Sequence, residues 1–263
     1  MMDEIEGIIV NEIDYRDTSK IVTILSEKGL IGAIAKGCKS PKSMLRSCTD
    51  KLTYGKFYLK YKENKLSTLN NFDNYNNFKN IKKDFIKLGF SMYLLDLSYQ
   101  VAKENFLSLI YINLIEGLKK IENGIDPLII TNILELKYLS ILGVSPVLDE
   151  CASCTSKNNI VGLSSNKGGL VCSNCFKNDM EVDEKTIKLI RLYYYIDIKK
   201  IDSFNVSKNI VNEINRFLDD YYERYTGLYL NGKKIVKDMY CWHLTIFFIC
   251  VIIPNMFRGN RYD

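Results

Sequence analysis

The chain has 263 residues, of which 47% are apolar and 25% are charged. This composition is ordinary for a globular protein, and it excludes collagen-like, mucin-like and wholly disordered chains. The length suits one large domain or two smaller ones. Acidic residues follow Met1, so we expect no signal peptide and a cytoplasmic protein. Eight cysteines in such a chain indicate a metal site before they indicate disulfides.

The charges are unevenly distributed along the chain. The formal net charge of +5 is only mildly basic, but residues 3–17 have a net charge of −5 and residues 20–65 have a net charge of +8. Such segregation favours a surface that faces a polyanion. A solvated, lysine-rich face that binds nothing is the alternative.

The first 70 residues are predicted to be β-structure. Short apolar runs rich in β-branched residues predict strands at 7–13, 21–25, 30–35, 57–61 and 66–69. The turn Ser26–Gly29 and the segment 62–65 each predict a hairpin between the strands on either side. Four or five short strands in this length favour a small barrel.

The hydrophobic period changes to that of helices after residue 84. Leu88, Met92, Leu95 and Tyr99 fall on one helical face. Further helices are predicted at 106–121, 127–142, 183–196 and 206–225, with a break in the helical pattern at 150–178. The sequence therefore predicts β-structure first and helices afterwards, with a cysteine-rich insert among the helices.

The apolar run Leu244–Ile253 is too short to cross a membrane, since a spanning helix needs roughly 20 residues. We interpret this run as a buried core element or a poorly matched terminus, and not as a membrane anchor.

The strongest motif is a pair of C-x2-C sequences separated by 17 residues. A C-x2-C turn directs two sulfurs at one ion, so two such turns complete a tetrahedron. The predicted ligands are Cys151, Cys154, Cys172 and Cys175. Four thiolates leave no open coordination position, so the sequence predicts one structural Zn2+ per chain. The alternatives are an eroded knuckle with four free thiols and, less favoured, a redox pair.

Catalytic motifs are scarce. His243 is the single histidine, which excludes histidine-based triads, and neither G-x-x-x-x-G-K-[ST] nor G-x-G-x-x-G occurs. Asp219, Asp220 and Glu223 could be imagined to bind Mg2+, although an exposed helix face beside Arg216 and Arg224 is the simpler interpretation. We expect no enzymatic activity.

A basic loop between the two predicted hairpins is the second candidate site. The expected nucleic-acid contacts are Lys20, Lys36, Lys39, Lys42 and Arg46. The aromatic residues interleaved with these and the neighbouring lysines are Tyr15, Tyr54, Phe57, Tyr58 and Tyr61. OB-folds bind single strands with cations for phosphates and aromatic rings for bases. The aromatic residues could equally be core residues, because alternation buries half of them.

Four stretches of this chain resemble the RecO family of bacterial recombination mediators. The first comprises Gly7–Val10 and Tyr15–Asp17, and the second runs from Ile21–Leu25 to Ala35–Gly37. The third begins at Leu134–Leu136, continues through Gly143, Pro146 and Leu148, and ends at Cys151–Cys154. The fourth runs from Gly168–Gly169 to Cys172–Cys175. The run from Glu135 to Cys154 is the most specific of them. Where the family usually has adjacent arginines, this chain has Cys38-Lys39-Ser40, and the resemblance ends near Met239.

The resemblance implies an α+β protein: an N-terminal OB-fold β-barrel, then an all-helical domain with an inserted four-cysteine zinc knuckle. We place these parts at 1–80, 81–240 (insert 150–178) and 241–263, the last an atypical apolar tail. It further implies a non-enzymatic mediator of DNA repair at the nucleoid, which binds single- and double-stranded DNA and anneals strands. Such a mediator would work together with RecR and RecF to load RecA onto strands coated by single-strand-binding protein.

Two rival functions remain at this point. One is an interaction scaffold whose basic surface binds acidic tails of partner proteins. The other is a zinc-ribbon nuclease or nucleotidyl transferase, which would need a clustered acidic pair for Mg2+.

Overall fold

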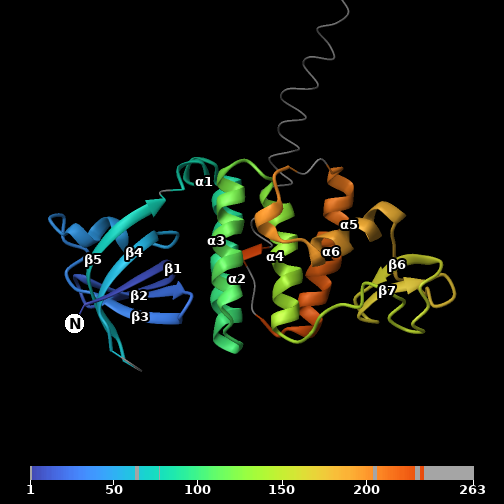
Figure 1. The fold of residues 1–263 in the computed structure, drawn as a ribbon, viewed down its shortest axis with the longest axis horizontal. Helices are drawn as coiled ribbons and strands as arrows, with labels where there is room; N and C mark the ends of the chain where they lie inside the picture. Colours follow the sequence, from blue (N-terminus) through green and yellow to red (C-terminus); the bar gives the residue numbers. More distant parts are fainter. Residues whose placement is uncertain (1, 63–64, 77, 204–205, 229–231, 234–263) are drawn as a thin grey trace, which may run out of the picture.

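The computed structural model describes residues 2–62, 65–76, 78–203, 206–228 and 232–233. A β-barrel forms one end of the molecule, a layer of helices forms the middle, and a small sheet forms the opposite end (Figure 1). The expected order of β-structure first and helices afterwards is confirmed. The apolar run Leu244–Ile253 lies outside the described residues. No described helix is long and apolar enough to span a membrane.

The barrel is closed by five strands. They are β1 (Asp3–Tyr15), β2 (Ser19–Ser26), β3 (Gly29–Ala35), β4 (Tyr54–Lys60) and β5 (Ser67–Asn76). Their order around the barrel is β1-β2-β3-β5-β4, so the predicted OB-type barrel is confirmed. Strands β2 and β3 form the predicted hairpin, in which Ser26 pairs with Gly29. Strand β5 extends seven residues beyond the predicted end at residue 69.

A pair of glycines lets the barrel close tightly where β1 meets β4. Gly7 and Gly55 are directly opposite each other in the register. A Cβ atom at Gly55 would lie 2.0 Å from the carbonyl oxygen of Asp73 on β5, and one at Gly7 would lie 2.5 Å from the side chain of Ile24 on β2. Neither position can accept a side chain without moving a neighbouring strand.

In the described residues, six α-helices of five residues or more follow the barrel. They are α1 (Lys79–Lys83), α2 (Phe85–Glu104), α3 (Ser108–Glu122), α4 (Pro127–Ile141), α5 (Glu184–Tyr195) and α6 (Lys208–Tyr225). Asp84, Asp126 and Asp183 cap the N-termini of α2, α4 and α5 through their side chains, as aspartates at this position typically do. Helix α4 lies in the centre and is buried along most of its length. The sequence did not predict α1, which has only five residues.

The core of the helical layer continues into the barrel. Ile8, Leu25 and Tyr54 from the barrel belong to the same buried cluster as the inner faces of α2, α3 and α4. A second, smaller cluster fills the inside of the barrel. The hydroxyl groups of Tyr54 and Tyr111 both donate to Oε1 of Glu6, at 2.7 and 3.1 Å, and so link β4, α3 and β1.

The insert contains a small sheet that the sequence did not predict. Strands β6 (Ile160–Ser164), β7 (Gly169–Cys172) and β8 (Met180–Glu181) pair in the order β7-β6-β8. These strands have only two to five residues, and Gly162 interrupts β6. Glycine is depleted in strands, and two residues are too few to show alternation, so none of the three was predicted.

Candidate metal centre and nucleic-acid surface

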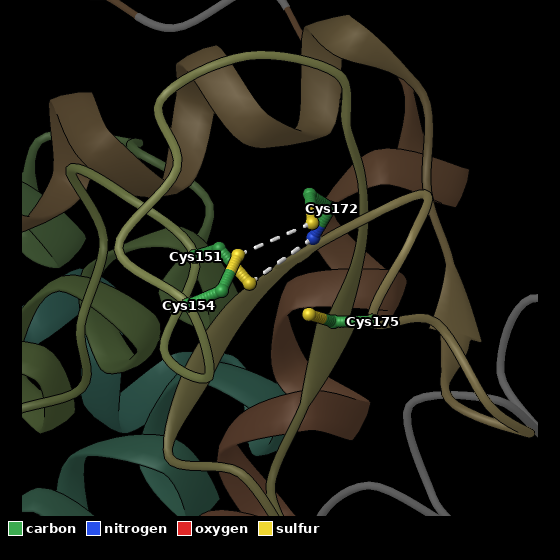
Figure 2. A group of neighbouring side chains, drawn as sticks. All are labelled: Cys151, Cys154, Cys172 and Cys175. Atoms are coloured by element: carbon green, nitrogen blue, oxygen red, sulfur yellow. Dashed lines mark hydrogen bonds between the residues drawn. The ribbon is translucent and has the colours of Figure 1, made fainter.

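The four cysteines of the insert converge on one point. Cys151 and Cys154 lie in a turn before β6, while Cys172 and Cys175 lie in a turn that begins at the end of β7 (Figure 2). Their Sγ atoms all lie within 4.8 Å of one another, and those of Cys154 and Cys172 are 3.6 Å apart. Thiolates placed tetrahedrally around zinc at 2.3 Å are separated by about 3.8 Å. The four sulfur atoms are therefore close to the arrangement that a single ion requires.

Backbone hydrogen bonds shape the two turns. The carbonyl of Cys151 accepts from the N–H of Thr155 at 2.9 Å, and the carbonyl of Cys172 accepts from the N–H groups of Cys175 and Phe176, both at 3.0 Å. The N–H of Cys172 donates to Sγ of Cys151 at 3.4 Å, which joins the two turns (Figure 2). These bonds hold the thiols together through local structure.

The electrostatics of the four thiols favour a cation. Burial alone would raise the pKa of Cys151, but hydrogen bonds from backbone N–H groups, first that of Cys172, lower it to about 6. The thiols of Cys154 and Cys172 raise the pKa of Cys175 to about 12. Four adjacent thiols cannot all ionise without a compensating charge, and a bound divalent ion supplies that charge.

Side chains outside the ligand set support the insert. Lys167 Nζ donates to the carbonyl of Cys175 at 2.7 Å and to Asp179 Oδ2 at 2.5 Å. Burial would raise the pKa of Asp179, but the hydrogen bond from Lys167 and that from the Lys177 N–H lower it. Arg191 of α5 donates to the carbonyl of Leu148 at 2.6 Å and so ties the start of the insert to the helical layer. Lys167, Asp179 and Arg191 could not be predicted from the sequence, because no spacing rule marks such supporting residues.

The acidic side chains considered for Mg2+ do not form a metal site. Within the described residues, the four cysteines are the one group whose ligand atoms lie close enough together to hold an ion. Asp219 instead forms an ion pair with Lys233 at 2.8 Å. His243 lies outside the described residues.

The basic loop connects β3 to β4 and contains a 3-10 helix, η1 (Met44–Cys48). Lys36, Lys39, Lys42 and Arg46 all lie on this loop, while Lys20 lies on β2. Lys36, Lys42 and Arg46 are exposed and form no ion pair with any described residue. Met44, between Lys42 and Arg46, is 83% exposed.

Hydrogen bonds hold the basic loop in place. The N–H of Gly37 donates to Ser19 Oγ at 3.2 Å, and the N–H of Lys39 donates to the carbonyl of Thr18 at 3.0 Å. Cys38 and Cys48, which the spacing left unpaired, are buried in the barrel core beneath the loop. The exposed cations are therefore presented from an ordered support.

The charge segregation along the chain is partly cancelled in space. The acidic strand β1 pairs with β2 and β4, which bring lysines opposite its carboxylates. The ion pairs that result from this pairing are Glu12 with Lys20 at 3.2 Å and Glu4 with Lys56 at 2.8 Å. Asp14 of β1 also pairs with Lys39 of the basic loop, at 2.9 Å. Lys20 also pairs with Asp50 at 2.8 Å. Of the five expected nucleic-acid contacts, Lys20 and Lys39 thus already have carboxylate partners.

The interleaved aromatic residues divide between core and surface. Tyr54 and Phe57 are buried in the core. Tyr58 donates its hydroxyl to Asp73 Oδ2 at 2.6 Å, and Tyr15 lies against the guanidinium of Arg16. Tyr61 is 45% exposed. The core interpretation therefore holds for Tyr54 and Phe57, and Tyr61 is the most accessible ring of the set.

Family comparisons agree with this arrangement. Residues 1–78 match the family model for the N-terminal part of recombination protein O, and residues 82–234 match the model for its C-terminal part. Together these matches cover most of the chain. The chain belongs to the RecO family.

Curated relatives extend this result over nearly the full length. The DNA repair protein RecO of Bacillus subtilis (strain 168) is 31% identical over 244 residues, which cover 91% of this chain and 95% of that protein. The proteins of the same name from Listeria monocytogenes serotype 4a and Listeria innocua serovar 6a are 31% and 32% identical over 246 residues. In both cases the match covers 92% of this chain and 96% of the relative. The resemblance to RecO seen in the sequence is thus confirmed.

Proposed function

We propose that this chain is a DNA-binding mediator of repair and recombination with no catalytic activity of its own. The observation that carries this proposal is the ordered basic loop of the OB-type barrel, which in a member of the RecO family presents three exposed cations that form no ion pair with the described residues. Lysine and arginine contacts to phosphate supply affinity without reading the sequence. The mediator would therefore act on many DNA sequences.

The proposed activities are annealing of complementary strands and loading of RecA together with RecR and RecF. The substrates of this protein would be single- and double-stranded DNA and strands covered by single-strand-binding protein. An annealing assay with and without these partners tests this part of the proposal. Metal-dependent DNA cleavage or ATP hydrolysis by the pure protein, abolished by a point mutation in this chain, would contradict the non-enzymatic assignment.

Salt dependence tests the basic loop as the DNA contact. The triple variant Lys36→Ala, Lys42→Ala, Arg46→Ala removes three cations. If each contacts a phosphate, the slope of log K against log salt should become less steep by about 2 on single strands, since each contact contributes about 0.7. Lys20→Ala and Lys39→Ala should have smaller effects, because Glu12, Asp50 and Asp14 already neutralise these lysines.

A matched control separates this effect from a change in net charge. The triple variant Lys157→Ala, Lys185→Ala, Lys208→Ala removes three exposed lysines that lie outside the barrel. We expect the control to keep the wild-type slope. Equal slopes for the control and the loop variant would show that the loop lysines only keep the loop solvated.

We also propose that the ion held by the four cysteines is Zn2+ and that it has a structural role. Four sulfur ligands with tetrahedral spacing suit zinc and leave no position for a substrate. When bound, the ion would neutralise the thiolates and hold the two turns together. Metal analysis should find one equivalent of zinc, which Cys172→Ser should remove and Cys48→Ser should leave in place, because Cys48 lies in the barrel core.

A further inference from the structure

A second group of lysines lies at one end of the helical layer, away from the basic loop in sequence. Helix α1, helix α3 and the 3-10 helix η2 (Ile198–Lys200) each carry two lysines in their last turn. With Lys79 at the start of α1, the lysine cluster comprises Lys79, Lys82, Lys83, Lys119, Lys120, Lys199 and Lys200. Figure 1 shows α1 beside the upper ends of the central helices.

Direct contacts hold the three elements together. The carboxylate of Glu122, the last residue of α3, accepts hydrogen bonds from the N–H groups of Asn80 and Ile81 of α1, both at 2.9 Å. Lys120 Nζ donates to the carbonyl of Lys199 in η2 at 3.0 Å. Through these contacts α1 and η2 both lie against the last turn of α3, so the elements that carry the lysines are brought together at one end of the helical layer.

The acidic residues nearby accept hydrogen bonds from backbone N–H groups or pair with lysines of the cluster. Both carboxylate oxygens of Glu122 cap α1, Asp84 caps α2, and Asp197 accepts from the N–H of Lys199 in η2. Glu116 pairs with Lys119 at 2.9 Å, and Asp202 lies 3.9 Å from Lys120. The exposed lysines of the cluster that form no ion pair with any described residue are Lys79, Lys82, Lys83, Lys199 and Lys200.

Complementing helix dipoles does not account for this number of cations. Lysines in the last turn of a helix do interact favourably with its C-terminal partial charge. However, α1 has only five residues and contains three lysines, and η2 is a single turn that contains two. The seven lysines also outnumber the five carboxylates named above, so this end of the helical layer keeps an excess of positive charge that favours an anionic partner.

We propose that the lysine cluster is a second phosphate-binding surface, which contacts the backbone of a DNA segment. This inference rests on the proposed DNA-binding function and adds a contact on the helical layer to the one on the barrel. Lysine ammonium groups act as point charges toward phosphate, so the surface would bind without base preference. A DNA segment long enough to reach both surfaces would be held at two places by one molecule.

The test uses the full chain with Lys82→Ala, Lys83→Ala and Lys199→Ala combined. The probe is a long single strand of mixed sequence, and the slope of log K against log salt is measured. We expect the slope to become less steep by about 2, and the Lys157, Lys185 and Lys208 control to match the wild type. These side chains are exposed, so thermal unfolding should confirm that the fold is unchanged. A slope equal to that of the control would overturn the proposal.

Comparison with the basic-loop variant separates the two proposals. If only the loop variant changes the slope, the lysine cluster is not a DNA contact and the loop assignment stands. If only the cluster variant changes it, the cluster assignment stands and the loop assignment fails. If the wild type binds no DNA, the proposed function itself fails. A further result would also overturn the cluster proposal: an acidic peptide that binds the wild type but not the cluster variant, with DNA binding unchanged.

Discussion

At the scale of single residues, a buried group of charges holds the end of the described chain against the central helix. Glu135, in the middle of α4, is fully buried, and it accepts hydrogen bonds from Tyr93 Oη at 2.5 Å and from Lys233 Nζ at 2.7 Å. Lys233 also pairs with Asp219 at 2.8 Å. Burial raises the pKa of Glu135. It would lower the pKa of Lys233, but the two carboxylates raise that pKa above its usual value.

Lys233→Met should lower the free energy of unfolding by about 3–5 kcal/mol, because it leaves Glu135 buried without its cation. Urea unfolding measures the change. Lys188→Met is the matched control, since Lys188 forms an exposed pair with Glu184 at 2.6 Å that solvent screens and that should contribute little to stability. The double variant Glu135→Gln, Lys233→Met should lose less than Lys233→Met alone. Equal losses for Lys233→Met and Lys188→Met would show that the buried pair adds nothing.

The same group makes stability depend on pH at the alkaline end. Because the pKa of Lys233 is raised above its usual 10.5 in the folded protein, its stabilising contribution is fully present below pH 10.5. The contribution is lost as the pH rises through the folded-state pKa. Between pH 9 and pH 11.5 the wild type should therefore lose more stability in urea than Lys233→Met. Parallel losses would contradict a charged Lys233.

Residues that act through local spacing could be predicted from the sequence, and residues that act through distant partners could not. The four cysteines follow a spacing rule that depends only on two turns. Glu135 and Lys233 are 98 residues apart, and nothing near either one indicates the other. Lys20 and Lys39 were expected to contact DNA, yet the pairing of β1 with β2 places Glu12 near Lys20, and the basic loop places Lys39 beside Asp14.

At the scale of elements, the metal site and the small sheet support each other. The N–H of Val147 donates to the carbonyl of Gly168 at 2.8 Å, and the N–H of Leu170 donates to the carbonyl of Val147 at 2.9 Å. A Cβ atom at Gly169 would lie 2.1 Å from the Val147 carbonyl oxygen, so only glycine fits there. A small sheet whose three strands have only two to five residues would be marginal without the metal.

Removal of the metal by a chelator should therefore loosen the insert selectively. We expect faster hydrogen exchange of backbone amides in residues 151–176 and unchanged exchange in β1–β5, because the barrel core contains no residue of the insert. Hydrogen exchange with mass spectrometry measures both regions. Faster exchange throughout the chain would mean that the whole fold depends on the metal, and no change would mean that the metal is dispensable to the insert.

Deletion after Tyr240 should leave DNA binding and metal content intact. The deletion retains Lys233 and with it every contact described for the helical layer. Metal analysis and DNA titration of the shortened chain check this expectation. A large fall in the temperature of thermal unfolding would instead show that residues 241–263 form part of the core.

Element prediction succeeded where the periodic pattern was long. The hairpin at Ser26–Gly29 and the helices α2 to α6 lie close to their predicted positions. Helix α1 was missed because five residues are too few for a helical period to be recognised. Strands β6 and β7 were missed because each contains a glycine and shows no clear alternation, and β8 has only two residues.

At the scale of the whole molecule, the barrel and the helices form one cooperative body. Their shared core includes Ile8 and Leu25 from the barrel, and Glu6 joins Tyr54 of β4 to Tyr111 of α3. Burial raises the pKa of both tyrosines, so both hydroxyls remain protonated and act as donors. The change of period near residue 84 indicated two regions, but contacts between β1 and α3 join segments about 100 residues apart that no local pattern connects.

Tyr111→Phe should lower stability by about 1 kcal/mol through the loss of one hydrogen bond to Glu6. Because the two regions share a core, the slowest amides of the barrel and of the helical layer should accelerate by the same factor in hydrogen exchange. Tyr195→Phe is the control, since the Tyr195 hydroxyl donates to Asp149 on the surface at 2.6 Å. Acceleration confined to the barrel would show that it opens independently.

The helical layer lies between the barrel at one end and the cysteine-rich insert at the other (Figure 1). The core of this layer continues into the barrel, so we expect the layer to act as a spacer between the two ends and not as a hinge. Because Leu163 and Leu170 of the insert belong to the same core, we expect the two ends of the molecule to keep a set spacing. A partner molecule that contacts both ends of one copy must therefore have contact points at that spacing or bend to reach them. A partner that can do neither would have to contact two copies of the protein.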